Sequence, residues 1–398
     1  MKRPAFAVGA TIAAVTTAAA TTVALATPAR AATTPPIPVG WPAVSSATQT
    51  APVRLAPGVT AYSEDYVTVD GPEHAELVSV DLTRHGVRLD TVESHDRIVD
   101  PANETTTSMG DRTGALAGIN GDYFAIRASG SPLGGVISHG RLLKSPRPNY
   151  QAQLRVERDG RVRIGRVDFR GTVRDATAAT AVTSRNTVTD AAAGGISQLT
   201  PDLGATTVTA GTLVIGRRSA GRLVVQEVRT SVTSVPALGP GQQALLGSGR
   251  GGTWLQQHVQ RGEKLAVTAS TTVPAATALI SGATVLVRQG RVYDDPTGTP
   301  PRGRNPETMV GVSRDGRHLL LVVIDGRQPT HSIGVTPLEA SQYLVAHGVD
   351  SGILLDGGGS STLAARLPGT ASLTIRNTVS DAAGERPVAN GLFLYRTA

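Results

Sequence analysis

Residues 319–327, Leu-Leu-Leu-Val-Val-Ile-Asp-Gly-Arg, join a continuous apolar run to an abrupt polar end. A run that is apolar at every position is typical of a strand buried on both faces of a sheet. Residues 336–339, Thr-Pro-Leu-Glu, combine a capping box with proline at the first helical position, which predicts a helix over 337–347. A second apolar run follows at 353–355. The stretch therefore predicts a strand–helix–strand unit.

An aspartate ends each predicted strand: Asp325 follows the first and Asp356 the second. If the strands are parallel neighbours, about 4.8 Å apart, both side chains emerge at one sheet edge, where ligands often bind. Repulsion between two close carboxylates should raise one pKa, and such a split pair suits chemistry at a glycosidic bond. The alternative is that Asp-Gly ends each strand in a plain turn.

The three glycines after Asp356 favour a binding site over a plain turn. Without side chains, Gly357, Gly358 and Gly359 can bring backbone N–H groups close to an anion. Ser360 adds a hydroxyl donor. We therefore expect this segment to bind a phosphate group.

Two upstream polar residues are candidates for the same site. Asn120 and Asp122 follow the apolar run 115–119 and are candidates for hydrogen bonds to sugar hydroxyls. The alternative is a hairpin turn, for which Asn-Gly is a strong signal.

Three further residues are candidates for roles in the site. His331 lies in the loop after Asp325 and is a candidate proton donor or sugar ligand; the alternative is an exposed loop histidine. Arg327 and Arg386 are candidate phosphate clamps, because a guanidinium group can bind a phosphate with two parallel hydrogen bonds. A surface position without such a role is the alternative for each arginine.

Most of the remaining chain indicates short strands. The runs 154–156 and 162–164 flank Asp159-Gly160 and predict a hairpin, while residues 171–250 indicate further short strands without a motif that carries chemistry. We predict an α+β fold, a strand-rich mixed sheet whose C-terminal strand–helix–strand unit carries the site.

The N-terminal segments differ from the rest in composition. Residues 1–31 combine a cationic start with an Ala/Thr-rich apolar stretch and a small-residue end, which predicts a signal peptide and a secreted, extracellular protein. Residues 32–56 are proline-rich and are predicted to be an extended linker. One domain is expected over 57–398, with N-terminal strands over 57–110 and a core over 111–398.

Composition excludes several function classes. The chain has no cysteine, which excludes disulfides, a cysteine nucleophile and thiolate-held metals. Only 3% of residues are aromatic, and removal of Lys2, Arg3 and Arg30 lowers the net charge from +7 to +4, so we expect no nucleic-acid partner. We expect no membrane partner after signal cleavage, because no later stretch reaches about 18 apolar residues. No cofactor is expected; bound calcium is compatible with the aspartates but not required.

Five motifs, in this order, resemble the phosphodiester glycosidase family over roughly residues 55–396. They are Gly-Ile-Asn-Gly-Asp-Tyr-Phe at 118–124, Ile-Asp-Gly-Arg-Gln at 324–328, Gly-Val-Thr with Leu-Glu at 334–339, Leu-Asp-Gly-Gly-Gly-Ser-Ser-Thr at 355–362, and Glu-Arg-Pro-Val-Ala-Asn at 385–390. The sequence departs from the family pattern at Glu307, where the family usually has arginine, and at Leu354, where asparagine often stands.

The resemblance implies a strand-rich α/β fold and hydrolysis of a sugar-1-phosphodiester to free sugar and a phosphomonoester. Within that reaction we assign Asp356 to attack or stabilise the oxocarbenium-like centre, and Asp325 to position or activate water. Two alternatives remain open: a phosphodiesterase that cleaves the P–O bond, and a non-catalytic protein that binds cell-wall glycopolymers. The sugar, its anomer and the oligomeric state do not follow from the sequence.

Overall fold

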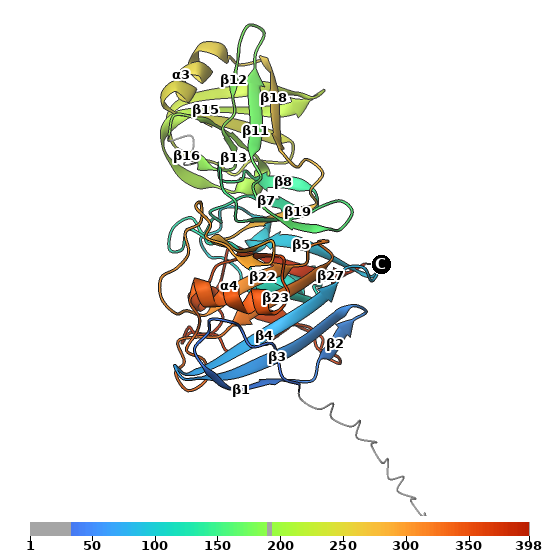
Figure 1. The fold of residues 1–398 in the computed structure, drawn as a ribbon. Coiled ribbons are helices and arrows are strands. Elements are labelled where there is room, and N and C mark those ends of the chain that lie inside the picture. The colour runs from blue at the N-terminus through green and yellow to red at the C-terminus, as the bar shows by residue number, and fades with distance from the viewer. Residues whose placement is uncertain (1–32, 189–192, 398) are drawn as a thin grey trace, which may run out of the picture. The chain divides into compact units, whose positions relative to one another are not determined.

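The apolar run at 319–324 lies in the middle of a large antiparallel sheet. The computed structural model describes residues 33–188 and 193–397, and the predicted signal peptide lies outside them. Within these residues nine strands form the sheet (Figure 1). Their order is β1 (Val44–Gln49), β3 (Val59–Thr68), β4 (Pro72–Asp81), β23 (His318–Ile324), β22 (Glu307–Val312), β24 (Ser351–Leu354), β20 (Thr284–Arg288) and β21 (Arg291–Val292), with β2 (Val53–Ala56) paired to β3.

Side chains of β23 alternate between two cores, which explains why the run is apolar at every position. Leu319, Leu321 and Val323 pack in a core that this sheet shares with two smaller sheets. Val322 and Ile324 pack on the other face, in the core that includes Tyr343 and Leu344 of α4 (Pro337–Ala346). The prediction of a strand buried on both faces is confirmed.

Helix α4 connects β23 to β24, and Thr336 forms the predicted capping box with Glu339. The two strands run in the same direction, but they are not neighbours, because β22 lies between them and is antiparallel to both. The expectation of direct pairing is therefore wrong. The physical reason is a tight turn, closed by the hydrogen bond from Gly316 N to Ser313 O, which returns the chain from β22 directly into β23.

Two five-stranded sheets are present in the described part of the chain. The first has the order β10 (Val162–Ile164), β9 (Gln153–Val156), β19 (Ala278–Ser281), β7 (Val136–Ser138) and β8 (Arg141–Lys144), and its β9–β10 pair confirms the predicted hairpin. The second has the order β26 (Thr374–Ile375), β25 (Leu363–Ala365), β6 (Ala117–Asn120), β27 (Asn390–Arg396) and β5 (Val87–Glu93).

Residues 169–271 contribute an eight-stranded sheet, again counted over the described residues. Its two longest strands, β15 and β16, have 14 residues each, so this region is not built of short strands alone. The order is β12 (Ala179–Ala181), β11 (Phe169–Arg174), β18 (Lys264–Thr271), β16 (Arg222–Val235), β15 (Thr206–Ser219), β17 (Gln242–Gly247), β14 (Ile196–Leu199) and β13 (Ser184–Arg185).

Few helices accompany these sheets. Besides α4, the helices of residues 33–188 and 193–397 are α1 (Thr106–Thr113), α3 (Gly249–His258) and the 3-10 turns η1 (Ser94–Asp96), η2 (Pro201–Leu203) and η3 (Gly358–Ser360). No helix among the described residues is long and apolar enough to cross a membrane. The predicted α+β class is confirmed, since the helices accompany mainly antiparallel sheets.

The segment 32–56, predicted to be a linker, contributes strands to the sheet instead. It contains β1 and β2, which both pair with β3. Trp41 anchors it: the indole ring lies 5.3 Å from the ring of Tyr66 and 5.9 Å from that of Tyr343, and Nε1 donates a hydrogen bond to Glu339 O. The prolines separate short strands, and the packing of Trp41 on Tyr66 and Tyr343 attaches the segment to the large sheet and α4.

Replacing Trp41 tests whether this segment is part of the folded unit. We expect Trp41→Ala to lower the free energy of unfolding by about 2 kcal/mol, less than the 3–5 typical of a fully buried tryptophan because Trp41 is half-buried. Chemical denaturation measures the change. Val39→Ala is the control, since Val39 is 89% exposed and should change stability little. Equal stability of both variants would contradict the packing role.

Candidate functional site

Three acidic side chains gather where strands of two sheets end. Asp122 follows β6, Glu307 begins β22 and Asp356 follows β24. The register pairs Glu307 with Ile324 on one side, and on the other side the pair Met309–Leu354 places position 356 beside Glu307. Relative exposure is 3% for Asp122, 0% for Glu307 and 9% for Asp356. The sheet register therefore builds a buried carboxyl cluster around Asp356.

Burial raises the pKa of all three carboxyl groups. The pKa of Glu307 rises to about 8, through burial and then the charge of Asp356, with Arg327 opposing. The pKa of Asp356 rises to about 7, where burial outweighs the hydrogen bond with Ser360 and Asp122 adds repulsion. Burial raises the pKa of Asp122 to about 6. Near neutral pH, Glu307 is therefore the carboxyl group that keeps its proton.

Glu307 is also the member of the cluster without hydrogen bonds. Neither Oε1 nor Oε2 has a partner among the described residues. A buried carboxyl group left in this way favours the neutral form, and it can give its proton to a substrate. In the sequence, Glu307 stands out only as a departure from a family pattern. The apolar residues Met309, Val310 and Val312 before Asp315-Gly316 were the signal for its strand.

Each of the three glycines after Asp356 has a packing reason. A Cβ on Gly357 would clash with Oε2 of Glu307, and one on Gly359 with the Arg386–Asp381 ion pair. Gly358 adopts φ +63°, a left-handed conformation that glycine tolerates best. The glycines therefore let charged side chains approach the backbone.

The backbone amides of this segment serve the protein itself. Gly358 N donates to Pro306 O over 2.7 Å, and Gly357 N donates to the Asp356 carboxylate. The guanidinium group of Arg327 lies beside Gly358 and that of Arg386 beside Gly359, while Lys144 and Arg147 act on Asp122. Arg327 donates to Asn305 Oδ1, and Arg386 donates to Asp381 and Ser360. An anionic substrate would meet these arginines rather than a row of amides.

The side chain of Asn120 connects three segments of the site by hydrogen bonds. Its Nδ2 donates to Asp356 O over 2.7 Å, and its Oδ1 accepts from Thr308 Oγ1 and Thr362 N. The side chain is fully buried. Asn120 does not form the turn that Asn-Gly suggests; it ends β6 and joins the ends of three strands. This geometry gives Asn120 a positioning role for Asp356.

Asp325 belongs to a second cluster at the same sheet edge. Its Oδ2 lies 2.9 Å from His331 Nε2 and accepts from Thr378 N, and its Oδ1 accepts from Asn377 Nδ2. His74 of β4 packs on His331, with ring centroids 4.7 Å apart. Since β22 intervenes, the ends of β23 and β24 are about two strand spacings, or ~10 Å, apart.

Asn377 joins the two clusters. Its Nδ2 donates both to Asp325 Oδ1 and to Ser361 O, three residues after Gly358. Asp325 is fully buried, and each of its carboxylate oxygens already has a partner in the protein. The sequence analysis placed Asp325 and Asp356 at one edge, and the structure does so, but Glu307 is the carboxyl group beside Asp356.

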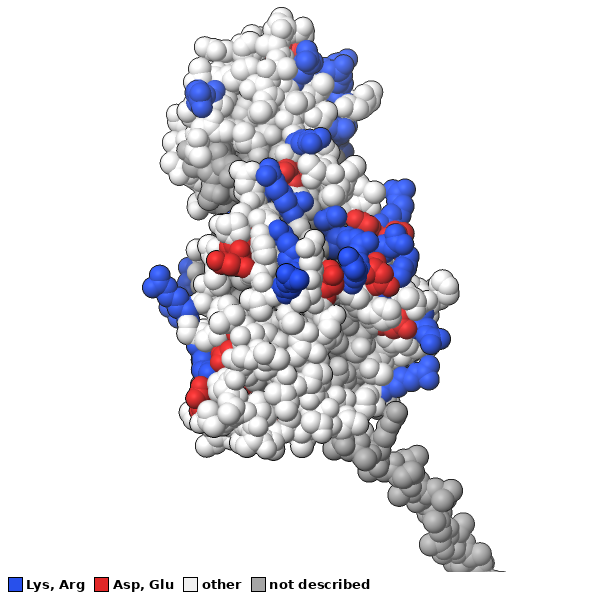
Figure 2. Space-filling view, in the orientation of Figure 1, with Lys and Arg blue, Asp and Glu red and all other residues white. Residues whose placement is uncertain are grey.

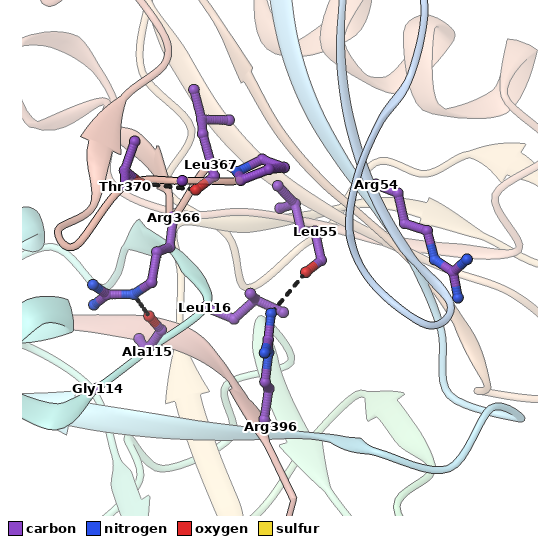
Figure 3. Close-up of a pocket in the computed structure, with 11 residues that line it drawn as sticks. Arg54, Leu55, Gly114, Ala115, Leu116, Arg366, Leu367, Thr370 and Arg396 are labelled. Carbon is purple, nitrogen blue, oxygen red and sulfur yellow. Dashed lines mark hydrogen bonds between the residues drawn. The ribbon is translucent and has the colours of Figure 1, made fainter.

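A cavity of about 530 Å³ lies away from both clusters (Figure 3). Arg54, Arg366 and Arg396 line it. Arg366 Nε donates to Ala115 O and Arg396 Nη2 to Leu55 O, each over 3.1 Å. The candidate site residues are not in its lining.

Charged side chains of both signs are interspersed on the face shown in Figure 2. Lys and Arg side chains gather over the middle of this face, with Asp and Glu side chains between them.

Comparison with known proteins bears on the family. A family model described as phosphodiester glycosidase matches residues 211–395. The resemblance to this family is confirmed over that stretch. It includes Glu307, Asp325, Asp356 and Arg386, whereas Asn120 and Asp122 precede it. No curated protein matches the chain.

Solved structures support the fold. A Burkholderia pseudomallei protein described as exported has 20% sequence identity and a TM-score of 0.72, with 92% of this chain and 100% of that one covered. A hypothetical protein from Synechocystis has 18% identity and a TM-score of 0.71, over 90% of this chain and 64% of that one. At these identities the likeness concerns the fold alone.

The catalytic domain of zebrafish N-acetylglucosamine-1-phosphodiester alpha-N-acetylglucosaminidase has 15% identity and a TM-score of 0.44. The match covers 92% of this chain and 87% of that one. At that TM-score the match supports no conclusion about this protein.

The raised pKa of Glu307 predicts a pH-dependent loss of stability. The folded state keeps this proton up to about pH 8, whereas the unfolded chain releases it near 4.5. The unfolded state therefore binds fewer protons between these values, and this contribution lowers stability as pH rises from about 4.5 to 8. We expect Glu307→Gln to flatten the decline, measured by denaturation at pH 5 and pH 8. Glu157→Gln, at the surface, should keep the decline; an unchanged slope in Glu307→Gln contradicts the assignment.

Proposed function

We propose that the protein is a secreted enzyme that hydrolyses the glycosidic bond of a sugar-1-phosphodiester. The bond between the anomeric carbon and the phosphate oxygen breaks, water supplies a hydroxyl group to the anomeric carbon, and a phosphomonoester leaves. One observation supports the proposal: within the family-matched stretch, the buried carboxyl group of Glu307, which has no hydrogen-bond partner among the described residues, lies beside Asp356 at the ends of neighbouring strands. Glycosidases usually cleave the glycosidic bond with two carboxyl groups, one protonated and one ionised.

Asp356 is the group we assign to the anomeric centre. Its ionised carboxylate would attack or stabilise the oxocarbenium-like carbon as the bond to phosphate breaks. Asn120 holds the main chain of Asp356 through its hydrogen bond to the carbonyl oxygen. Burial and, to a smaller extent, repulsion by Asp122 raise the pKa of Asp356 to about 7, so Asp356 can gain or lose a proton near neutral pH.

Glu307 and two arginines are assigned to the leaving group. A phosphomonoester is already a stable anion, so charge stabilisation matters more than strong acid catalysis. Arg327 and Arg386 flank Gly358 and Gly359 and supply that positive charge. The Glu307 proton can pass to the departing phosphate oxygen or hydrogen-bond to it.

Asp325 and His331 are assigned a supporting role. Their connection to the Asp356 segment runs through Asn377, which bonds Asp325 and the carbonyl of Ser361. We propose them as positioning residues that hold the loop carrying Arg327.

The substrate class follows from the proposed location. A secreted enzyme of this type would act on a sugar-phosphodiester outside the cell, such as a wall glycopolymer whose sugars are linked through phosphate. The signal-like segment at 1–31 supports export. Neither a nucleic acid nor a membrane is part of the proposal.

Removal of the Asp356 charge tests its role in the reaction. We expect Asp356→Asn to lower the rate of sugar release from a sugar-1-phosphodiester by at least ~100-fold, because the anomeric centre loses its carboxylate. Asp350→Asn is the matched control, since Asp350 lies at the opposite end of β24 and should keep full activity. A folded, fully active Asp356→Asn protein would refute the assignment.

Hydrolysis in oxygen-18 water identifies the bond that breaks. The proposal predicts that the label appears in the released sugar, because water attacks the anomeric carbon. Label in the phosphate product would instead identify a phosphodiesterase. Retention of a wall glycopolymer without any product would favour the binding protein. Mass spectrometry of both products distinguishes these outcomes.

The rate of hydrolysis plotted against pH should give a bell-shaped curve. Activity rises as Asp356 ionises, around pH 7, and falls as Glu307 loses its proton, around pH 8. Because the carboxyl groups of Asp356 and Glu307 interact, the two limbs of the rate–pH curve report on the pair and not on either group alone. The charged neighbours of the pair are Asp122, Arg386 and Arg327. We expect Glu307→Gln to remove the alkaline limb and to lower the maximum rate by about 10²-fold. An alkaline limb that survives this substitution would exclude Glu307 as the proton donor.

A further inference from the structure

Two histidines and one aspartate converge beside the carboxyl cluster. They are His74 of β4, Asp325 at the end of β23 and His331 in the loop that follows, and one ligand atom from each lies within 4.8 Å of the others. Pairing of β4 with β23, in which Ala75 faces Ile324, brings His74 to Asp325. A strand pair between distant segments thus assembles a set of two imidazole nitrogens and one carboxylate oxygen.

The side chains of this cluster are held in place by neighbours. His74 Nδ1 lies 2.6 Å from Asp65 Oδ1, and its Nε2 lies 3.4 Å from Glu76 Oε1. A carboxylate that binds the outer nitrogen of a histidine is the usual support of a metal-bound imidazole. Asn377 and Thr378 fix the Asp325 carboxylate. His331 completes the set from a half-exposed loop, which leaves a path from solvent.

Carboxylates outnumber guanidinium groups around the cluster. Three carboxylates contact the two histidines: Asp65, Glu76 and Asp325. A single guanidinium group, that of Arg376, pairs with Glu76 at 3.2 Å. Among the described residues, three carboxylates therefore stand against one guanidinium group, and a divalent cation would compensate the excess negative charge.

We propose that His74, Asp325 and His331 bind a divalent transition-metal ion of the Zn²⁺ class. Two imidazole nitrogens favour such an ion over Ca²⁺ and Mg²⁺, which prefer oxygen ligands. Three protein ligands leave a coordination position for water. Asp325 and His331 also have positioning roles in the proposed hydrolysis, but metal binding is measured without substrate, so the two proposals can fail separately.

A bound ion would also stiffen the loop that carries Arg327. His331 and Asp325 flank this arginine in sequence, and the ion would tie both to β4. Arg327 adopts φ +62°, an unfavourable conformation for a residue with a side chain. Metal binding would thus support the placement of Arg327 over Gly358.

Zinc titration of the untagged protein tests the proposal, since a histidine tag would itself bind metal. We expect one Zn²⁺ per chain by calorimetry and a higher unfolding temperature with Zn²⁺. Proton release, read from the binding heat in two buffers, should accompany binding because the imidazoles must be neutral. Neither Ca²⁺ nor Mg²⁺ should produce the thermal shift.

Two variants and one control make the test specific. His331→Ala and His74→Gln should each lower Zn²⁺ affinity at least tenfold, and the metal-free unfolding temperature of each shows whether it folds. His258→Ala should keep full affinity, because His258 forms a similar histidine–aspartate pair with Asp175, 2.9 Å apart, outside the cluster. Absence of saturable Zn²⁺ binding to the unaltered protein overturns the proposal. Unaltered Zn²⁺ affinity in a folded His331→Ala protein overturns it as well.

Discussion

The antiparallel pairing of β22 with both β23 and β24 is the constraint on which the site depends. It places Glu307 between the residues that end the two flanking strands. One carboxyl cluster therefore forms around Asp356, and Asp325 is directed to the histidines on the β4 side. A register shift of one residue would turn the Glu307 side chain to the opposite face of the sheet.

Burial of the acidic groups is unfavourable by itself, and the two cores beside the sheet offset it. The alternate side chains of β23 fill both cores, and Glu307 on the neighbouring strand is buried with no hydrogen-bond partner among the described residues. Desolvation then raises the pKa of Glu307 to about 8 and that of Asp356 to about 7, so Glu307 is the group that keeps its proton near neutral pH. The raised pKa values at this edge are thus a consequence of the same packing that stabilises the fold.

Several features followed from local sequence. The capping box at Thr336, the hairpin over 154–164 and the doubly buried strand at 319–324 each depend on neighbouring residues. The role of the 32–56 segment could not be predicted in this way, because Trp41 packs on rings from distant parts of the chain. Likewise His74 carries no motif, and only the pairing of β4 with β23 brings it to Asp325.

The sequence by itself determined the α+β class and the resemblance to the phosphodiester glycosidase family, and it singled out the Asp356-Gly-Gly-Gly segment as a candidate site. The tertiary structure decided which carboxyl group is the partner of Asp356, how each glycine is used, and how Asn120 connects segments of the site. The physical reason is the separation in sequence of the residues that interact. Caps, turns and burial patterns arise from residues close in the chain. Strand order and side-chain proximity at a sheet edge arise from pairings between remote segments, which local patterns do not encode.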